Sequence, residues 1–296
     1  MVNTIAIYTP LLHGLLKLAG MKPQAVELEP GTTVHFWIPT KPTNKPVVVL
    51  LHGFGLNGIL TWQFQILSLA REYAIYVPDF LFFGESITDK PNRSPAFQAE
   101  CIAMSLRKLG VEKCSLVGLS YGGMVGFVMA AMYPDLVKSM VVSGSVLALT
   151  ESITSTGLQR IGFSSWNEYL LPETVEGVKN MLEIASYKLP WMPSFVFRHI
   201  LEVMFDNRKE RNELLDTLIT KDKDFTIAHF SQSQNIHLLW GENDRIFNLE
   251  VAQNLREQLE GKAPLHCIKK AGHLVPMERP CFYNSQLKKI LATIYH

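Results

Sequence analysis

A chain of 296 residues with 47% hydrophobic and 19% charged residues is long enough to bury a large core and too apolar to remain disordered. Its formal net charge of +1, without a basic cluster among aromatics, excludes bulk attraction to nucleic acid or to an anionic membrane. No apolar stretch reaches the roughly 18 residues of a membrane span, so we expect no integral membrane segment.

The four cysteines are widely spaced and form no C-x-x-C pair: Cys101, Cys114, Cys267 and Cys281. This spacing argues against a zinc site or a redox motif, and we expect no bound metal. Free thiols in or beside strands are typical of a reducing compartment, so the sequence predicts a cytoplasmic protein.

Near the N-terminus, the segment "LLHGLLKLAG" (residues 11–20) resembles the apolar core of a signal peptide. However, no cationic segment precedes it and Lys17 interrupts it. We interpret it as a short amphipathic helix that packs on the body of the protein.

The first half of the chain alternates buried strands with amphipathic helices. A Pro-Gly turn joins two strands within residues 25–39, and a strand with a continuous apolar run ends in the glycine-rich corner "LHGFG". Further strands are expected in residues 73–80, 113–120 and 137–145, and helices in 58–71, 95–109 and 124–133. Such alternation predicts an α/β protein with a parallel sheet covered on both faces.

This alternation stops between residues 145 and 234, where the pattern is helical without a convincing strand. Strands and helices resume from residue 235. We therefore expect two core segments, 1–144 and 235–296, separated by a helical cap at 145–234. An insertion of this kind usually lies over the ends of the strands, where ligands bind in α/β sheets.

Between a strand and a helix, "GLSYG" (residues 118–122) fits the G-x-S-x-G pattern. Glycines two residues on either side of Ser120 allow a tight turn that lifts the hydroxyl clear of the sheet. A glycine-flanked serine can also be a simple helix cap, but the strand before it and the helix after it favour a nucleophile.

A serine nucleophile needs a base and an acid that orients the base. His273 follows the last predicted strand and is the candidate base, whereas His52 stands in the glycine corner and is interpreted as structural. Asp244 is the candidate acid, with Glu242 as the alternative. The order Ser120, Asp244, His273 is that of one class of serine hydrolase.

An oxyanion requires two preorganised backbone donors. The residue after the nucleophile supplies one of them, which here is the N–H of Tyr121. We expect the second from the corner "LHGFG", from Phe54 rather than Gly55.

The motifs "HGFG", "DFLFFGES", "GLSYGG", "WGENDRIF" and "GHLVPMERP" resemble, in this order, those of the α/β-hydrolase superfamily. The chain looks closest to plant members of the branch that includes meta-cleavage-product hydrolases and related esterases. The resemblance implies an α/β-hydrolase fold with a mostly parallel eight-stranded sheet, no cofactor, and a triad of Ser120, Asp244 and His273. Asp79 matches a family position that is usually structural.

Two positions depart from the C–C bond hydrolases of that branch, which typically carry asparagine and tryptophan where this chain has Leu119 and Leu274. A ring-fission substrate is therefore not favoured. Epoxide hydrolases and haloalkane dehalogenases of the superfamily use aspartate at the position of Ser120, so the resemblance disfavours both chemistries.

Large apolar side chains in the cap predict an apolar or aromatic ligand. Candidate substrate contacts are Trp166, Trp191 and Leu274. We expect a monomeric or weakly dimeric serine hydrolase, of the carboxylesterase type, acting on a small ester. The alternatives are a small-molecule receptor that keeps the triad, and a lyase, acyltransferase or C–C bond hydrolase that uses it.

Overall fold

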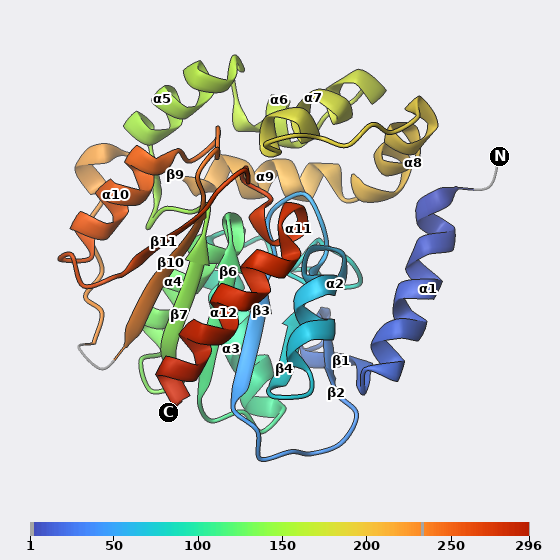
Figure 1. The fold of residues 1–296 in the computed structure, drawn as a ribbon, viewed down its shortest axis with the longest axis vertical. Helices are drawn as coiled ribbons and strands as arrows, with labels where there is room; N and C mark the ends of the chain where they lie inside the picture. The colour runs from blue at the N-terminus through green and yellow to red at the C-terminus, as the bar shows by residue number, and fades with distance from the viewer. Residues whose placement is uncertain (1–2, 232–233, 296) are drawn as a thin grey trace.

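The computed structural model describes residues 3–231 and 234–295 (Figure 1). Its centre is a sheet with strand order β1-β2-β4-β3-β6-β7-β10-β11, and the short strand β5 pairs with β2. The first two pairings are antiparallel, and all pairings from β4 to β11 are parallel. The predicted mostly parallel eight-stranded sheet is thus confirmed, with β5 added at its side.

The strands of this sheet have the following bounds: β1 Met21–Glu29, β2 Thr32–Pro39, β3 Val47–Leu51, β4 Ala74–Pro78, β5 Ile87–Thr88, β6 Cys114–Leu119, β7 Val137–Ser143, β10 Asn235–Gly241 and β11 Leu265–Ile268. Strand β3 explains the continuous apolar run. Val49 and Leu51 join one core cluster, Val48 and Leu50 join the other, and none of the four has exposed surface. A parallel strand covered on both faces needs apolar side chains at every position.

Helices cover both faces of the sheet (Figure 1). On one face lie α1 Thr4–Leu18, α2 Gly58–Leu69 and α12 Pro280–Tyr295. On the other face lie α3 Pro95–Lys108, α4 Tyr121–Met132 and α10 Leu249–Gln258. Helix α3 begins as expected, because the Ser94 hydroxyl accepts from the Phe97 amide at 3.2 Å and Pro95 occupies the first turn.

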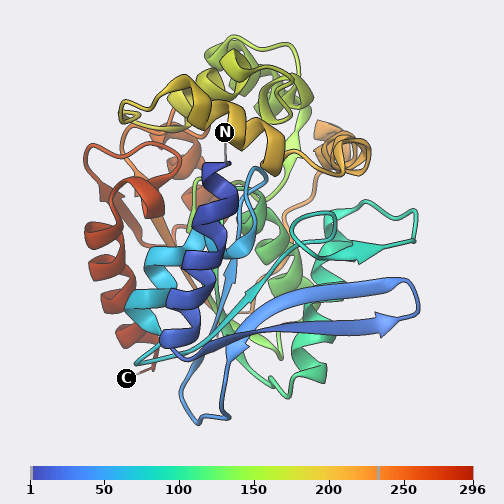
Figure 2. The same cartoon turned by 90° about the vertical axis from the view of Figure 1, so that its right-hand side faces the viewer.

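Five further helices form a separate layer over the carboxyl ends of the parallel strands (Figures 1 and 2). They are α5 Glu151–Ile161, α6 Trp166–Leu170, α7 Val175–Ala185, α8 Ser194–Met204 and α9 Arg208–Leu218. The sequence did not predict the two short strands that flank this layer, β8 Leu149–Thr150 and β9 Ile219–Thr220. They pair parallel with each other, and strands of two residues carry no periodic signal. After β9 comes a single 3₁₀ turn, Asp222–Asp224.

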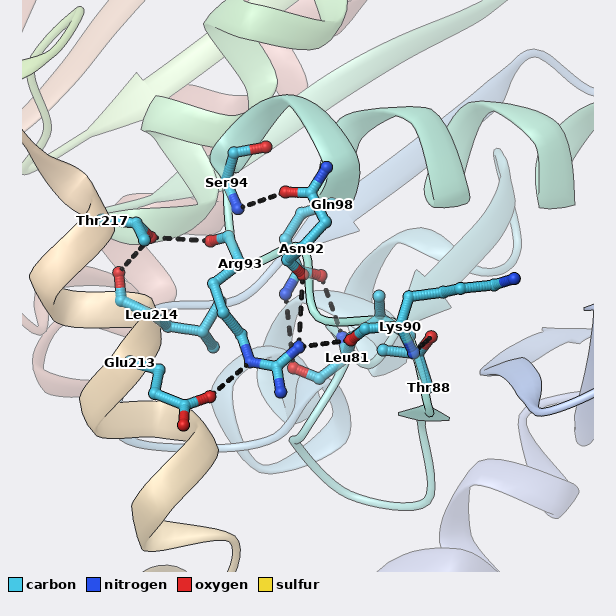
Figure 3. A network of polar contacts seen from close by, with 10 residues as sticks. All are labelled: Leu81, Thr88, Lys90, Asn92, Arg93, Ser94, Gln98, Glu213, Leu214 and Thr217. Atoms are coloured by element: carbon cyan, nitrogen blue, oxygen red, sulfur yellow. Dashed lines mark hydrogen bonds and ion pairs between the residues drawn. The ribbon is translucent and has the colours of Figure 1, made fainter.

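Polar contacts fasten α9 to the loop before α3 (Figure 3). The Arg93 Nε atom lies 2.9 Å from Glu213 Oε2, and the Thr217 hydroxyl donates to the Arg93 carbonyl at 2.8 Å. The buried Arg211 of α9 donates from Nε to the Phe82 carbonyl at 2.9 Å. This end of the helical layer is therefore anchored to the core by side chains on both sides.

Candidate active site

The turn between β6 and α4 holds Ser120 in a strained backbone conformation. Its φ is 54° and its ψ is −118°, a region that costs a residue with a side chain about 1–3 kcal/mol. The Ser120 amide donates to the Ser143 carbonyl at 2.9 Å, and the Ser145 hydroxyl donates to the Ser120 carbonyl at 2.7 Å. These contacts from the end of β7 hold the strained turn on two sides.

The flanking glycines are required by close approach of the backbone. A Cβ atom at Gly118 would lie 2.7 Å from the Gly122 carbonyl oxygen, and a Cβ atom at Gly122 would collide with the Leu51 carbonyl. A Cβ atom at Gly123 would lie 2.6 Å from Ser145, which supports the turn. The G-x-S-x-G pattern thus reflects the space that this elbow leaves.

A hydrogen bond of 2.8 Å joins His273 Nδ1 to Asp244 Oδ2, and both side chains are buried. Because a carboxylate only accepts, Nδ1 is the donor, and Nε2 is left able to take a proton. The other carboxylate oxygen of Asp244 accepts from the amides of Ile246 at 2.8 Å and Phe247 at 2.9 Å. The structure brings Asp244, rather than Glu242, to the imidazole.

The loop that carries His273 is tied to the helical layer through Glu278, the last residue of α11 (Val275–Glu278). One carboxylate oxygen accepts from the Gly272 amide at 2.6 Å, and the other accepts from the Tyr187 amide at 2.7 Å. The Leu274 amide donates to the Ala185 carbonyl at 3.1 Å. Sequence reasoning missed this role of Glu278, because nothing in the pattern indicated which amides it would meet.

The imidazole of His273 also has close neighbours on two sides. Gly144 has a φ of +52°, and a Cβ atom there would lie 2.7 Å from Nδ1, so only glycine fits under the ring. The Phe247 ring lies 5.8 Å from the imidazole, centroid to centroid. Packing and hydrogen bonding together hold the ring in one orientation.

Ser120 and His273 both line one cavity of about 910 Å³. The core side of its wall includes Phe54, Tyr121 and Leu274. Side chains of α6 to α9 form the opposite wall, including Trp166, Tyr169, Met181, Met204 and Leu215. Helix α1 also reaches the cavity, through Ile5, a contact that no sequence pattern indicated.

Of the three predicted substrate contacts, Trp166 and Leu274 line this cavity and Trp191 does not. The Trp191 side chain is 87% exposed. It lies in the segment without regular secondary structure between α7 and α8, in which the neighbouring Pro190 and Met192 line the cavity. The Trp191 side chain is therefore turned to solvent. Placing it in the pocket was wrong.

His52 fixes the corner from which the second oxyanion donor is expected. The Phe80 amide donates to His52 Nε2 at 3.0 Å, so Nδ1 carries the hydrogen and donates to the Gly53 carbonyl at 2.7 Å. Burial lowers the pKa of this histidine to about 4, which keeps it neutral. The structural role predicted for His52 is thereby explained.

The hydrogen bond from His52 to the Gly53 carbonyl also orients the amide of Phe54, because both groups belong to one planar peptide unit. In a trans peptide the N–H points opposite to the C=O, so the Phe54 N–H points away from the His52 ring. The Tyr121 amide opens α4 and therefore has no partner within the helix. Among the described residues, no group accepts a hydrogen bond from either amide.

Asp79 lies outside this site. Its carboxylate accepts from the Gly58 amide at 2.7 Å, at the start of α2, and the Ser86 hydroxyl donates to its carbonyl at 2.8 Å. These contacts hold a loop and a helix terminus, in agreement with the structural role predicted from the motif.

Comparison with known proteins identifies a family model and relatives that match most of the chain. A model of the α/β hydrolase fold family matches residues 46–280. Epoxide hydrolase 4 of Homo sapiens is 25% identical over 277 residues, which cover 81% of this chain and 70% of the relative. Monoacylglycerol lipase ABHD6 of Homo sapiens is 23% identical, with 86% of this chain and 78% of the relative covered.

A solved structure shares the fold across nearly the whole chain. The 2-hydroxy-6-oxo-6-phenylhexa-2,4-dienoate hydrolase of Rhodococcus sp. strain RHA1 superposes with a TM-score of 0.75 at 20% identity. The match covers 91% of this chain and 98% of that chain. The family model spans most of the chain and includes the elbow, the acid and the histidine, so this protein belongs to the α/β hydrolase fold family.

Proposed function

We propose that the chain is a serine hydrolase that cleaves carboxylic esters of small apolar or aromatic substrates through an acyl-enzyme. The observation that carries this proposal is the 2.8 Å hydrogen bond between Asp244 and His273, on a cavity that the strained Ser120 also lines. Membership of the family supports hydrolase activity. The serine at the elbow, with an imidazole on the same cavity, favours acyl transfer.

In the proposed mechanism, His273 Nε2 takes the hydroxyl proton of Ser120 as Oγ bonds to the ester carbonyl carbon. The electron pair of the carbonyl moves to its oxygen, which the N–H groups of Phe54 and Tyr121 would stabilise. Asp244 stabilises the imidazolium, which then gives its proton to the departing alcohol as the C–O bond breaks. Water then attacks the acyl carbon while His273 Nε2 takes its proton, and the C–Oγ bond breaks as that proton returns to Ser120 and the acid is released.

The cavity favours an apolar acyl or alcohol group. Its volume of about 910 Å³ leaves room for more than an acetyl group. The side chains that α6 to α9 contribute are mostly aromatic or aliphatic. We therefore expect kcat/KM on a series of p-nitrophenyl esters to rise from acetate to a medium-length acyl chain. A maximum at acetate would argue against an acyl site in this cavity.

The two named human relatives suggest different substrates, an epoxide and a monoacylglycerol. Ser120 favours the ester, because an epoxide hydrolase of this superfamily carries an aspartate at that position. We expect no diol to form from styrene oxide under conditions in which a p-nitrophenyl ester is hydrolysed. Rapid diol formation would favour the epoxide reaction instead.

Replacing the nucleophile tests the proposal. Ser120→Ala should lower the hydrolysis of a p-nitrophenyl ester by about 10⁴-fold or more, because the acyl-enzyme cannot form. Ser155→Ala, at an exposed serine of α5, should leave the rate unchanged. Unaltered turnover by a folded Ser120→Ala protein would refute the assignment.

A cytoplasmic location and a monomeric or weakly dimeric state remain predictions. The described cysteines are all free, and Cys267 and Cys281 are exposed, which supports a reducing compartment.

A further inference from the structure

Helix α1 carries apolar side chains on its buried face and also on its exposed surface. Leu12 and Leu16 are buried against the body. The exposed surface presents a second apolar set, which we call the outer stripe: Ile7 (51% exposed), Tyr8 (41%), Leu11 (63%), Leu15 (51%) and Leu18 (87%), with the Tyr8 hydroxyl donating to Gln63. A helix on the surface of a water-soluble protein normally turns polar residues outward. The exposed apolar side chains of the outer stripe therefore indicate a surface that binds a partner.

The helix that carries the outer stripe reaches the active-site cavity with its first turn. Ile5, in the first turn of α1, lines that cavity. The same end of the helix is joined to α8, where the Thr4 amide donates to His199 Nδ1 at 3.0 Å and the Asn3 side chain donates to Glu202 at 3.0 Å. Figure 2 shows α1 facing the viewer, with α8 directly above it.

The segment before α8 completes the rim of the cavity. Lys188, Leu189, Pro190 and Met192 line the cavity, and Trp191 projects outward with 87% of its surface exposed. An exposed tryptophan and an apolar helix face therefore lie beside one opening. Proteins place tryptophan at the headgroup level of a bilayer, and lysine side chains extend their charged ends to that level.

We propose that the outer stripe and Trp191 form a docking surface for a phospholipid bilayer. Helix α1 contains no acidic residue, and its one charged residue is the exposed Lys17. With Lys188 on the rim, exposed cations stand toward both ends of the surface, as suits anionic headgroups. Two carboxylates also lie near this surface: Glu202, which accepts from the Asn3 side chain, and Glu278, which accepts from the Tyr187 and Lys188 amides.

A bilayer fits this surface better than a second copy of the chain. A stable dimer buries about 800 Å² on each partner, more than five partly exposed side chains on one helix of about 22 Å can supply. An apolar helix face of this length is sufficient to insert shallowly at a membrane surface. The docked protein would hold its cavity mouth against the lipid, so that an apolar substrate could enter without crossing water.

The docking surface is independent of the proposed chemistry, and its test does not use turnover. The full chain is mixed with vesicles of non-hydrolysable diether phosphatidylcholine containing about 20 mol% diether phosphatidylserine, and the bound fraction is measured by flotation. We expect binding together with a blue shift of tryptophan fluorescence. The double variant Leu11→Gln/Leu15→Gln should lower the partition coefficient between vesicles and water by about tenfold or more. Adding Trp191→Ala to this double variant should lower it further.

Met104→Gln/Met132→Gln is the matched control. These side chains are 42% and 45% exposed on α3 and α4, which cover the other face of the sheet from α1 (Figure 1). The control should bind like the wild type, and all variants should keep its melting temperature. Failure of the wild type to float, or equal binding by the α1 double variant, would overturn the proposal. A vesicle-independent dimer that Leu11→Gln/Leu15→Gln dissociates would also overturn it, in favour of a second copy.

Discussion

At the scale of single residues, the two carboxylate oxygen atoms of Asp244 accept hydrogen bonds from different partners. One oxygen accepts from two backbone amides, and the other accepts from His273. In Asp244→Asn, the amide oxygen can still serve the backbone, but the NH₂ group cannot accept from Nδ1. We expect kcat/KM for ester hydrolysis to fall by about a thousandfold or more, with a similar KM.

Glu242 provides the control for that prediction, since it is the neighbouring carboxylate in the same loop. Glu242→Gln should keep its activity within about twofold. If Glu242→Gln were the inactive variant, and Asp244→Asn the active one, the acid would have to be reassigned.

Glu278 is a positioning residue, because it acts on His273 only through the Gly272 amide. Its replacement by alanine leaves three amides without their acceptor, those of Gly272, Tyr187 and Lys188. We expect Glu278→Ala to lower kcat about 10- to 100-fold through misplacement of the imidazole, with less change in KM. Glu278→Gln, which keeps one oxygen acceptor, should recover part of the loss. A lower melting temperature with an unchanged kcat would reduce Glu278 to a structural role.

The buried His52 makes stability depend on pH. Its pKa is about 4 in the folded protein and about 6.5 when unfolded. The unfolded chain therefore binds the extra proton between these values. The contribution of neutral, buried His52 to the free energy of unfolding is complete above pH 6.5. It is lost as the pH falls toward 4.

Between pH 7 and pH 5, this histidine should remove about 2 kcal/mol from the free energy of unfolding. Urea denaturation of the wild type and of His52→Gln at both pH values measures that difference. The variant is less stable at pH 7 but should lose about 2 kcal/mol less on acidification. Equal pH dependence of the two proteins would show that His52 titrates normally.

At the scale of elements, Arg211 joins α9 to the core. Its guanidinium donates to the Phe82 and Met204 carbonyls at 2.9 and 2.6 Å, contacts Asp206, and lies 4.3 Å from the centroid of the Phe83 ring. In Arg211→Met, the Met204 carbonyl loses the Arg211 hydrogen bond, and the Phe82 carbonyl keeps only the Asn207 side chain as a donor, at 3.3 Å. We expect a loss of about 2–4 kcal/mol in the free energy of unfolding, measured by chemical denaturation.

Lys209→Met is the control for Arg211→Met, because Lys209 is an exposed residue of the same helix. The free energy of unfolding of Lys209→Met should stay within about 0.5 kcal/mol of the wild-type value. Equal stability of both variants would mean that α9 does not depend on this anchor. The Arg93–Glu213 pair of Figure 3, in which Glu213 is partly exposed, should matter less than Arg211.

The elements with strong periodicity or clear caps were predictable, whereas those defined by distant contacts were not. Helix α3 has both a capping serine and a proline at its start, and β3 has an uninterrupted apolar run. By contrast, β8 and β9 have two residues each and form only because residues 149 and 219 meet in space. Helix α1 was expected to be amphipathic, and only the structure reveals that apolar side chains are also exposed beside its buried face.

At the scale of the whole molecule, chain order and strand ends indicated most of the candidate site. Parallel strands bring their carboxyl ends to one edge, so the corners after β3, β6, β10 and β11 had to meet there. That rule anticipated the positions of Phe54, Ser120, Asp244 and His273. It could not place Ile5 or Trp191, because their positions depend on how α1 and the helical layer pack against the core.

The most direct test of the account is to capture the nucleophile. The protein is incubated with a fluorophosphonate, and the modified residue is identified by intact mass and peptide mass spectrometry. We expect a single adduct on Ser120, formed much more slowly in His273→Ala, because phosphonylation of a serine needs the same base as acylation. An adduct on another residue, or full ester turnover by protein that stays unmodified, would contradict the account.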